Sequence, residues 1–167
     1  MITPDWVRMM AAYNAEMNHR LYAAASRLPP EERRRDRGAF WGSIEGTLSH
    51  LVWGDRTWMA RFAGWPKPAQ TMGESVALAA DFAALHAARV ETDAAIEAWA
   101  AALDAAWLAG ELRWFSGAAQ REVTAARSML VTHMFNHQTH HRGQVHAMLT
   151  AAGERTGDTD LFLVLPT

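Results

Sequence analysis

Four long stretches of this chain repeat apolar residues at the three- and four-residue spacing of an amphipathic helix. They run from Thr3 to Leu28, from about Ser43 to Phe62, from about Ala80 to Leu108 and from about Thr124 to Ala152. The connections between them are short, and strand patterns do not alternate with helix patterns. This arrangement predicts an all-α fold, a four-helix bundle in one domain spanning residues 1–167.

Two segments fall outside these four helices. Leu112–Phe115 and Gln120–Val123, with a glycine-containing turn at Ser116-Gly117, predict a short hairpin or irregular segment before the last helix. Near the end of the chain, the apolar run from Leu161 to Leu165 is expected to pack against the bundle.

Composition excludes several classes of function. The formal net charge of -2 argues against nucleic acid as the main partner, and no apolar run predicts a membrane span or a signal peptide. The absence of cysteine excludes a thiolate ligand, a thiol nucleophile and a disulfide, and suits a cytoplasmic protein. Eight tryptophans and nine methionines exceed what four helices need to bury, so we expect a homodimer.

The last helical segment carries five of the eight histidines of the chain. His133, His137 and His141 follow one another at four-residue spacing and therefore form one stripe, with His140 at its edge and His146 pointing away. Two imidazoles four residues apart can share a metal ion. Because neighbours in the stripe are one turn apart, the ligand pair is either His133/His137 or His137/His141.

A third ligand must come from another helix, and His50 in the second helical segment is the best candidate. Its own helix face carries small or polar residues, as a ligand facing an open cavity requires, namely Thr47, Gly54, Thr57 and Arg61. No glutamate lies between the paired histidines as in the HExxH motif, so the sequence does not predict a metalloprotease.

Arg89 falls on the apolar stripe of the third helical segment. A buried charge is costly unless it is paired. We therefore expect Arg89 either to bind an internal carboxylate such as Asp55 or to line a polar pocket.

The two histidine-bearing segments resemble the DinB/YfiT-like family of metal-dependent enzymes. The resemblance is carried by GSIEGTLSHLVWGDRTWMARF and NHQTHHRGQV, extends to YNAEMNHRL near the N-terminus, and covers nearly the whole chain. It implies an up-down-down-up four-helix bundle with a divalent metal ion held by His50, His137 and His141. His133 then becomes a pocket residue or a partner of a ligand.

The resemblance also bears on the reaction, because relatives include transferases and isomerases that use bacillithiol, mycothiol or glutathione. Three imidazoles leave a coordination position open and suit zinc or nickel. We expect the metal to activate a low-molecular-weight thiol that attacks a small electrophilic substrate. Arg61 or Arg89 would steer a carboxylate, and His133 or His140 would carry the proton.

Two alternatives remain open from the sequence. One is a metal-dependent hydrolase, in which water takes the place of the thiol, and the other is a non-catalytic, metal-containing binding or stress-response module. Asn136, Gln144 and Asp55 are candidates to orient the imidazole rings in each case, because of their position in sequence and helix phase.

Overall fold

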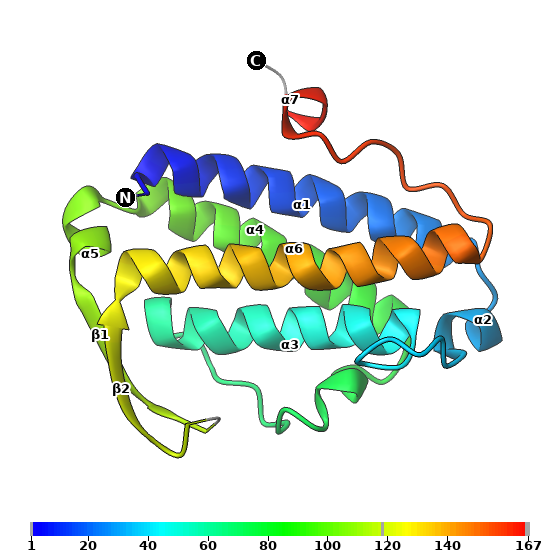
Figure 1. Cartoon of the computed structure of the whole chain (residues 1–167), viewed down its shortest axis with the longest axis horizontal. Helices are drawn as coiled ribbons and strands as arrows, with labels where there is room; N and C mark the ends of the chain where they lie inside the picture. The colour runs from blue at the N-terminus through cyan, green and yellow to red at the C-terminus, as the bar shows by residue number, and fades with distance from the viewer. Residues whose placement is uncertain (1, 118, 166–167) are drawn as a thin grey trace.

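The computed structural model describes residues 2–117 and 119–165, and most of them are helical. Four long helices lie side by side: α1 (Pro4–Ser26), α3 (Ile44–Ala63), α4 (Phe82–Ala102) and α6 (Arg127–Ala151) (Figure 1). Helices α1 and α3 each pack against both α4 and α6. The chain direction, followed by colour in Figure 1, is the same in α1 and α6 and opposite in α3 and α4. The predicted all-α class is confirmed.

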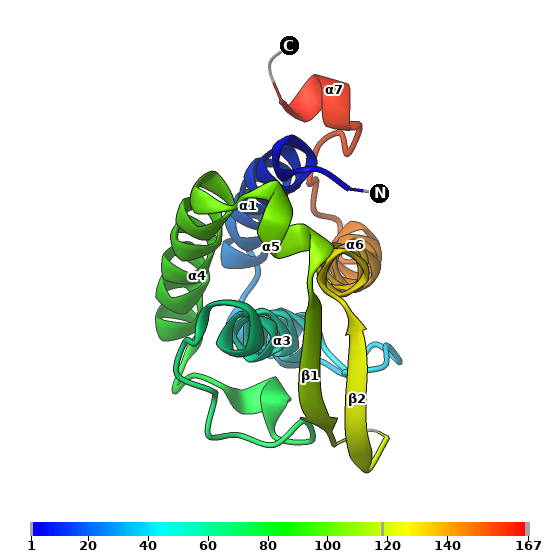
Figure 2. The same ribbon diagram turned by 90° about the vertical axis from the view of Figure 1, so that its left-hand side faces the viewer.

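The predicted hairpin before the last helix is also present. Strand β1 (Glu111–Ser116) pairs antiparallel with β2 (Arg121–Ala126), so that Glu111 faces Ala126 and Ser116 faces Arg121. The hairpin projects from one end of the bundle (Figure 2). Because β2 extends to Ala126, the last helix begins at Arg127 and not at Thr124 as expected.

Short polar side chains set the helix starts. The Ser43 hydroxyl oxygen accepts a hydrogen bond from the Gly46 amide at 3.0 Å and caps α3, whose far end is closed by Gly64 in the left-handed conformation. The Asp81 carboxylate accepts from the Ala84 amide at 2.8 Å, which starts α4 at Phe82.

The prediction of one helix from Ala80 to Leu108 is wrong at its C-terminal end. Helix α4 ends at Ala102, Leu103 is extended, and a separate short helix, α5 (Ala105–Ala109), follows. The Asp104 carboxylate accepts a hydrogen bond from the Trp107 amide at 2.6 Å, so this residue caps a new helix and does not continue the old one.

The remaining short elements are α2 (Pro30–Arg34), the 3-10 turn η1 (Ser75–Ala77) and α7 (Leu161–Val164). The tail was expected to pack on the bundle, but Phe162 and Leu163 of α7 are 68% and 58% exposed. Figure 1 shows α7 lying beyond α1, where the Tyr13 hydroxyl donates to the Thr159 carbonyl at 2.6 Å. No helix in the described part of the chain is long and apolar enough to cross a membrane.

The interior consists of two apolar clusters, and each long helix contributes to both. Along every helix a buried polar segment separates the residues of one cluster from those of the other. We call this set the polar layer: Asn14 and Asn18 of α1, Asp55 of α3, Arg89 and Asp93 of α4, and Gln138 and Arg142 of α6.

The polar layer ties the four helices together at one level. Arg89 donates to Asp55 at 2.6 Å and forms an ion pair with Asp93 at 2.8 Å. Gln138 of α6 donates to the other Asp55 oxygen at 2.9 Å, and Asn18 of α1 donates to Asp93 at 3.0 Å. The expected Arg89–Asp55 contact is confirmed. The network fixes the axial positions of α3 and α6, the two helices that carry the candidate metal ligands.

Candidate metal centre

The histidines of α3 and α6 meet where these two helices lie side by side. One nitrogen from each of His50, His137 and His141 lies within 4.8 Å of the other two. The Nε2 atoms of His50 and His137 are 3.2 Å apart. Of the two pairs that helical spacing allows, the fold brings His137/His141 to His50. The three residues form a cluster that could hold a divalent metal ion.

The separation of the His50 and His137 nitrogens fits a shared ion. Two nitrogens bound to one tetrahedral zinc ion at its usual bond length are about 3.3 Å apart. Without an ion, the same 3.2 Å separation allows one ring to donate an N–H to the other, so the distance suits both a hydrogen bond and a shared metal ion. The residues present therefore fit a metal of the zinc type.

The His50 ring is oriented by Ser75 of η1. The Ser75 hydroxyl donates its hydrogen to the Met72 carbonyl at 2.6 Å, so its oxygen must accept from His50 Nδ1–H at 2.8 Å. This hydrogen bond places the ring proton on Nδ1 and leaves the Nε2 lone pair facing the cluster.

The two histidines of α6 have different surroundings. His141 Nδ1 donates to the Gln144 side-chain oxygen at 2.7 Å, which leaves its Nε2 lone pair free. His137 Nδ1 is buried and has no hydrogen-bond partner among the described residues. Of the expected orienting residues, Gln144 makes the contact, Asn136 is exposed, and Asp55 is bound within the polar layer.

Burial keeps the three imidazoles neutral. Burial and the neighbouring His137 and His141 rings lower the pKa of His50 from 6.5 to about 3, and burial with the rings around it lowers the pKa of His137 to about 3. Burial also lowers the pKa of His141. Neutral imidazole is the form that binds a metal ion, so all three lone pairs are available at neutral pH.

Gly54 provides the space that the His137 ring occupies. A β-carbon at this position would lie 3.0 Å from His137 Cε1, which is closer than such contacts normally come. Gly54 follows His50 by one turn of α3, so the two helices approach closely beside the cluster.

Two indole rings stack on the His50 imidazole. Trp41 stacks on the His50 ring with 4.0 Å between centroids, and Trp53 stacks on it with 5.6 Å. Trp41 precedes α3 and Trp53 belongs to it. These contacts, together with the Ser75 hydrogen bond, restrict rotation of the ring.

The two histidines expected to carry a proton lie outside the cluster. His133 is exposed, and its ring centroid is 6.1 Å from that of His137. His140 is exposed, and its centroid is 4.8 Å from that of His141. Burial and the neighbouring Arg61 guanidinium lower the pKa of His133, so it is neutral at pH 7.

The two arginines expected to bind a carboxylate differ in accessibility. Arg61 is half-buried, and its guanidinium carbon lies 4.5 Å from the centroid of a Trp58 ring. Arg89 is 2% exposed and forms ion pairs with Asp55 and Asp93. The expectation that Arg89 steers a substrate is therefore corrected: it is an interior residue of the polar layer.

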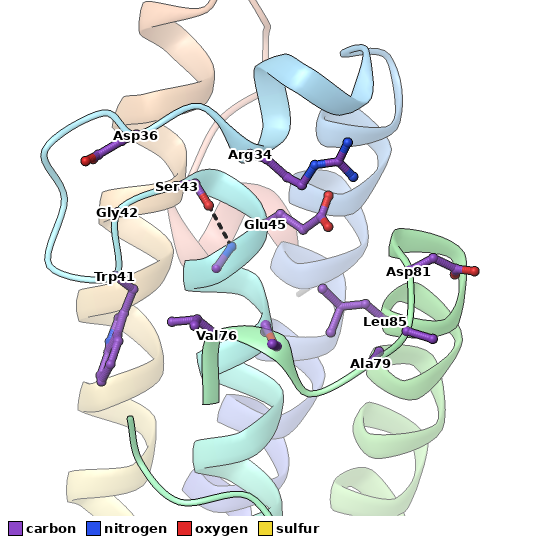
Figure 3. A pocket seen from close by; sticks show the side chains of 14 residues that line it. Arg34, Asp36, Trp41, Gly42, Ser43, Glu45, Val76, Ala79, Asp81 and Leu85 are labelled. Atoms are coloured by element: carbon purple, nitrogen blue, oxygen red, sulfur yellow. Dashed lines mark hydrogen bonds between the residues drawn. The ribbon is translucent and has the colours of Figure 1, made fainter. Parts of the chain in front are cut away.

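A cavity of about 530 Å³ adjoins this centre at the N-terminal end of α3. Figure 3 shows Trp41 on one side of it, Asp81 and Leu85 on the other, and Arg34 and Glu45 at its charged edge. None of the three clustered histidines lines this cavity, and Trp41 is the wall that it shares with the surroundings of His50.

Sequence reasoning missed Ser75 and Trp41. Ser75 lies in a segment to which no element was assigned, although a signal was present. Thr71 and Glu74 have the spacing of a capping box, and Glu74 accepts from the Thr71 amide at 2.8 Å and from its hydroxyl at 2.9 Å. Trp41 had no comparable signal, because its contact with His50 depends on the path of the loop between α2 and α3.

Comparison with known proteins places the chain in a family. Residues 1–165 match the family model described as "DinB family". The chain is also 26% identical over 177 residues to "Protein DinB" of Bacillus subtilis (strain 168), an alignment that covers 96% of this chain and 94% of that protein. The match over nearly the whole length shows that this chain belongs to the DinB family.

Proposed function

We propose that this protein is a divalent-metal-dependent enzyme that transfers a low-molecular-weight thiol to a small electrophilic substrate. The observation that carries the proposal is the meeting of three neutral imidazoles from two helices, with one nitrogen of each within 4.8 Å of the others. His50, His137 and His141 would hold the ion.

The ligand set favours zinc or nickel, since imidazole nitrogen suits both ions. Three protein ligands leave a coordination position open, which is the arrangement of catalytic sites. When bound, such an ion lowers the pKa of a thiol or a water molecule and so supplies a nucleophile near neutral pH.

The chain contains no cysteine, so a sulfur nucleophile must arrive with a co-substrate. The thiol proton would pass to a ring nitrogen of His133 or His140, the two histidines beside the cluster. The sulfur electron pair would then form a bond to carbon of the electrophile, and the leaving group would depart with its own bonding pair. Burial and the neighbouring Arg61 guanidinium lower the pKa of His133, so this ring is unprotonated at neutral pH and is able to accept a proton.

Metal content and thiol transfer test this proposal separately. Protein purified without a nickel column is analysed for metal, then incubated with a panel of thiols and a chromogenic chloroarene. We expect one metal ion per chain and a thiol-dependent rate that His141→Ala abolishes. Equally low metal in wild type and His137→Ala would reject the site. Turnover of an ester or amide without thiol would instead indicate a hydrolase, and metal without turnover a binding module.

We also propose that the bundle has the up-down-down-up order that the resemblance implies and that two copies form a homodimer. The helix directions visible in Figure 1 support the first point. Exposed apolar side chains such as Met129, Phe162 and Leu163 support the second. Light scattering at micromolar concentration tests the dimer, and the mass of a single chain would reject it.

A further inference from the structure

Arg61 lies in the last turn of α3 with its guanidinium against two indole rings. The guanidinium carbon is 4.5 Å from the centroid of a Trp58 ring and 5.9 Å from that of Trp114, which comes from β1. No carboxylate or other hydrogen-bond acceptor is paired with Arg61 within residues 2–117 and 119–165. Trp58 of α3 and Trp114 of β1 therefore both lie against the Arg61 guanidinium, which has no hydrogen-bond or ion-pair partner in the described part of the chain.

The other arginines that are buried or half-buried do have partners. Arg56, on the same helix, donates to Thr92 at 2.9 Å and pairs with Glu91 at 2.9 Å. The same is true of the rest of this group: Arg20, Arg33 and Arg37 bind carboxylates, Arg89 binds two, Arg127 binds a carbonyl and Arg142 binds Asn14. Arg61 is the exception in the part of the chain that the structure describes.

This environment suits an anion. A guanidinium packed against aromatic faces keeps its charge and its planar set of donors but has lost part of its hydration. A carboxylate restores those hydrogen bonds with two parallel N–H···O contacts. The flat Trp58 and Trp114 rings would hold the hydrocarbon or aromatic part of the same molecule.

Arg61 lies on the side of α3 that faces the metal centre. The Trp58 ring that packs on Arg61 also contacts the His133 ring at 5.2 Å between centroids. His133 in turn lies 6.1 Å from His137. Along α3, Gly54 touches His137, and the seven residues from Gly54 to Arg61 span about 10 Å. A small molecule could thus contact Arg61 at one end and reach the histidine cluster with the other.

We propose that Arg61, Trp58 and Trp114 form a carboxylate-binding subsite for a molecule that reacts at the metal centre. The inference rests on the proposed function for the identity of that molecule, which is a small carboxylic acid with an apolar body. The carboxylate belongs either to the thiol or to the electrophile, and these two sources are separated below.

A binding experiment on metal-free protein decides whether the subsite exists, because it needs neither metal nor turnover. Benzoate and its neutral counterpart benzamide are titrated while the indole N–H signals of Trp58 and Trp114 are followed by NMR. We expect benzoate to shift both signals and benzamide to leave them unchanged. Arg61→Gln should weaken benzoate binding about tenfold or more, and Arg61→Lys should weaken it less, because lysine keeps the charge without the paired donors.

Arg56→Gln is the matched control, since it removes a half-buried arginine of the same helix that already has partners. It should bind benzoate like the wild type. Benzoate binding that is equal in wild type and Arg61→Gln, or equal binding of benzamide, would overturn the subsite. That result would leave the metal centre, which is measured by metal content, unaffected.

Kinetics of metal-loaded protein then identify which reactant carries the carboxylate. Mercaptoacetate is compared with mercaptoethanol, and chloroacetate with chloroacetamide. Arg61→Gln should raise the KM of either mercaptoacetate or chloroacetate, and it should leave the KM of the two uncharged compounds unchanged. Arg56→Gln should leave the KM of all four compounds unchanged. A KM that Arg61→Gln leaves unchanged for both carboxylates would overturn the role of the subsite in the reaction. Absence of turnover with every pair, alongside benzoate binding at Arg61, would reject the transferase and keep the subsite as a binding site.

Discussion

The Ser75 hydroxyl accepts a hydrogen bond from His50 Nδ1 at 2.8 Å while donating its own hydrogen to the Met72 carbonyl. Ser75 is fully buried, and its carbonyl accepts from the Ser49 hydroxyl at 2.7 Å. The connection between α3 and α4 is thereby attached to the ring that faces the histidine cluster. The tautomer of His50 thus depends on a residue 25 positions further along the chain.

Ser75→Ala should weaken metal binding without unfolding the protein. Loss of the acceptor frees the His50 ring to rotate or change tautomer, and loss of such a contact typically costs about 10–100-fold in metal affinity. Competition with a chromogenic chelator measures the change. Ser26→Ala is the control, because the Ser26 hydroxyl also donates to a carbonyl, that of Tyr22 at 2.7 Å, but does not contact a histidine. Equal affinities of Ser75→Ala and the wild type would contradict the orienting role.

Gly54→Ala should displace the His137 ring. The added β-carbon would lie 3.0 Å from His137 Cε1, so ring or helix must move by several tenths of an ångström. We expect a marked loss of bound metal, measured by elemental analysis after dialysis.

Gly143→Ala on α6 provides the comparison for this change. A β-carbon at Gly143 meets nothing within 4 Å, so this variant should keep its metal. It should also be more stable by about 0.5–1 kcal/mol, because alanine favours a helix interior. If Gly54→Ala keeps its full metal content, the added β-carbon does not displace the His137 ring from the metal centre, and the prediction is wrong.

Stability of the metal-free protein should fall as the solution becomes acidic. His50 and His137 have an ordinary pKa of 6.5 and a folded pKa of about 3, so the unfolded chain binds more protons between these values. Their contribution is therefore fully present above pH 6.5 and is lost as the pH falls towards about 3. Chemical denaturation at several pH values measures this slope.

The control for this prediction is the double variant His50→Gln/His137→Gln, which removes both titrating groups. Its free energy of unfolding should vary less between pH 6.5 and 3 than that of the wild type. Identical slopes in the two proteins would show that other groups dominate the acid response.

Arg89→Met should destabilise the fold by about 3–5 kcal/mol, because it leaves Asp55 and Asp93 buried without their cation. Arg56→Met breaks an ion pair with Glu91, whose side chain is 78% exposed, and should cost about 1 kcal/mol or less. Denaturant unfolding measures both. Equal costs for the two variants would contradict a structural role for the polar layer.

Much of the fold could be predicted because its determinants are local. The helical periods and the turn at Ser116-Gly117 each depend on residues close together in the sequence, so α1, α3, α6 and the hairpin were predicted. The break at Leu103–Asp104 was missed although Asp104 is a good cap, because the alanine-rich sequence on either side supports a continuous helix equally well. The position of α7 could not be predicted, since an apolar run indicates burial but does not show which surface would cover it.

Some features of the candidate site could be predicted from the sequence, and others depend on the tertiary structure. By itself, the sequence determined that His133, His137 and His141 share a helix face and that any metal pair must be one turn apart. It also determined that Arg89 either binds an internal carboxylate or lines a polar pocket. Only the tertiary structure decided that His137 and His141 meet His50, that Ser75 orients His50, and that Arg89 is enclosed while Arg61 is not. Helix periodicity specifies the direction in which each side chain points from its own helix. The contacts between helices depend, in addition, on the relative axial positions of α3, α4 and α6. The polar layer and the close approach at Gly54 set those positions through residues far apart in the chain.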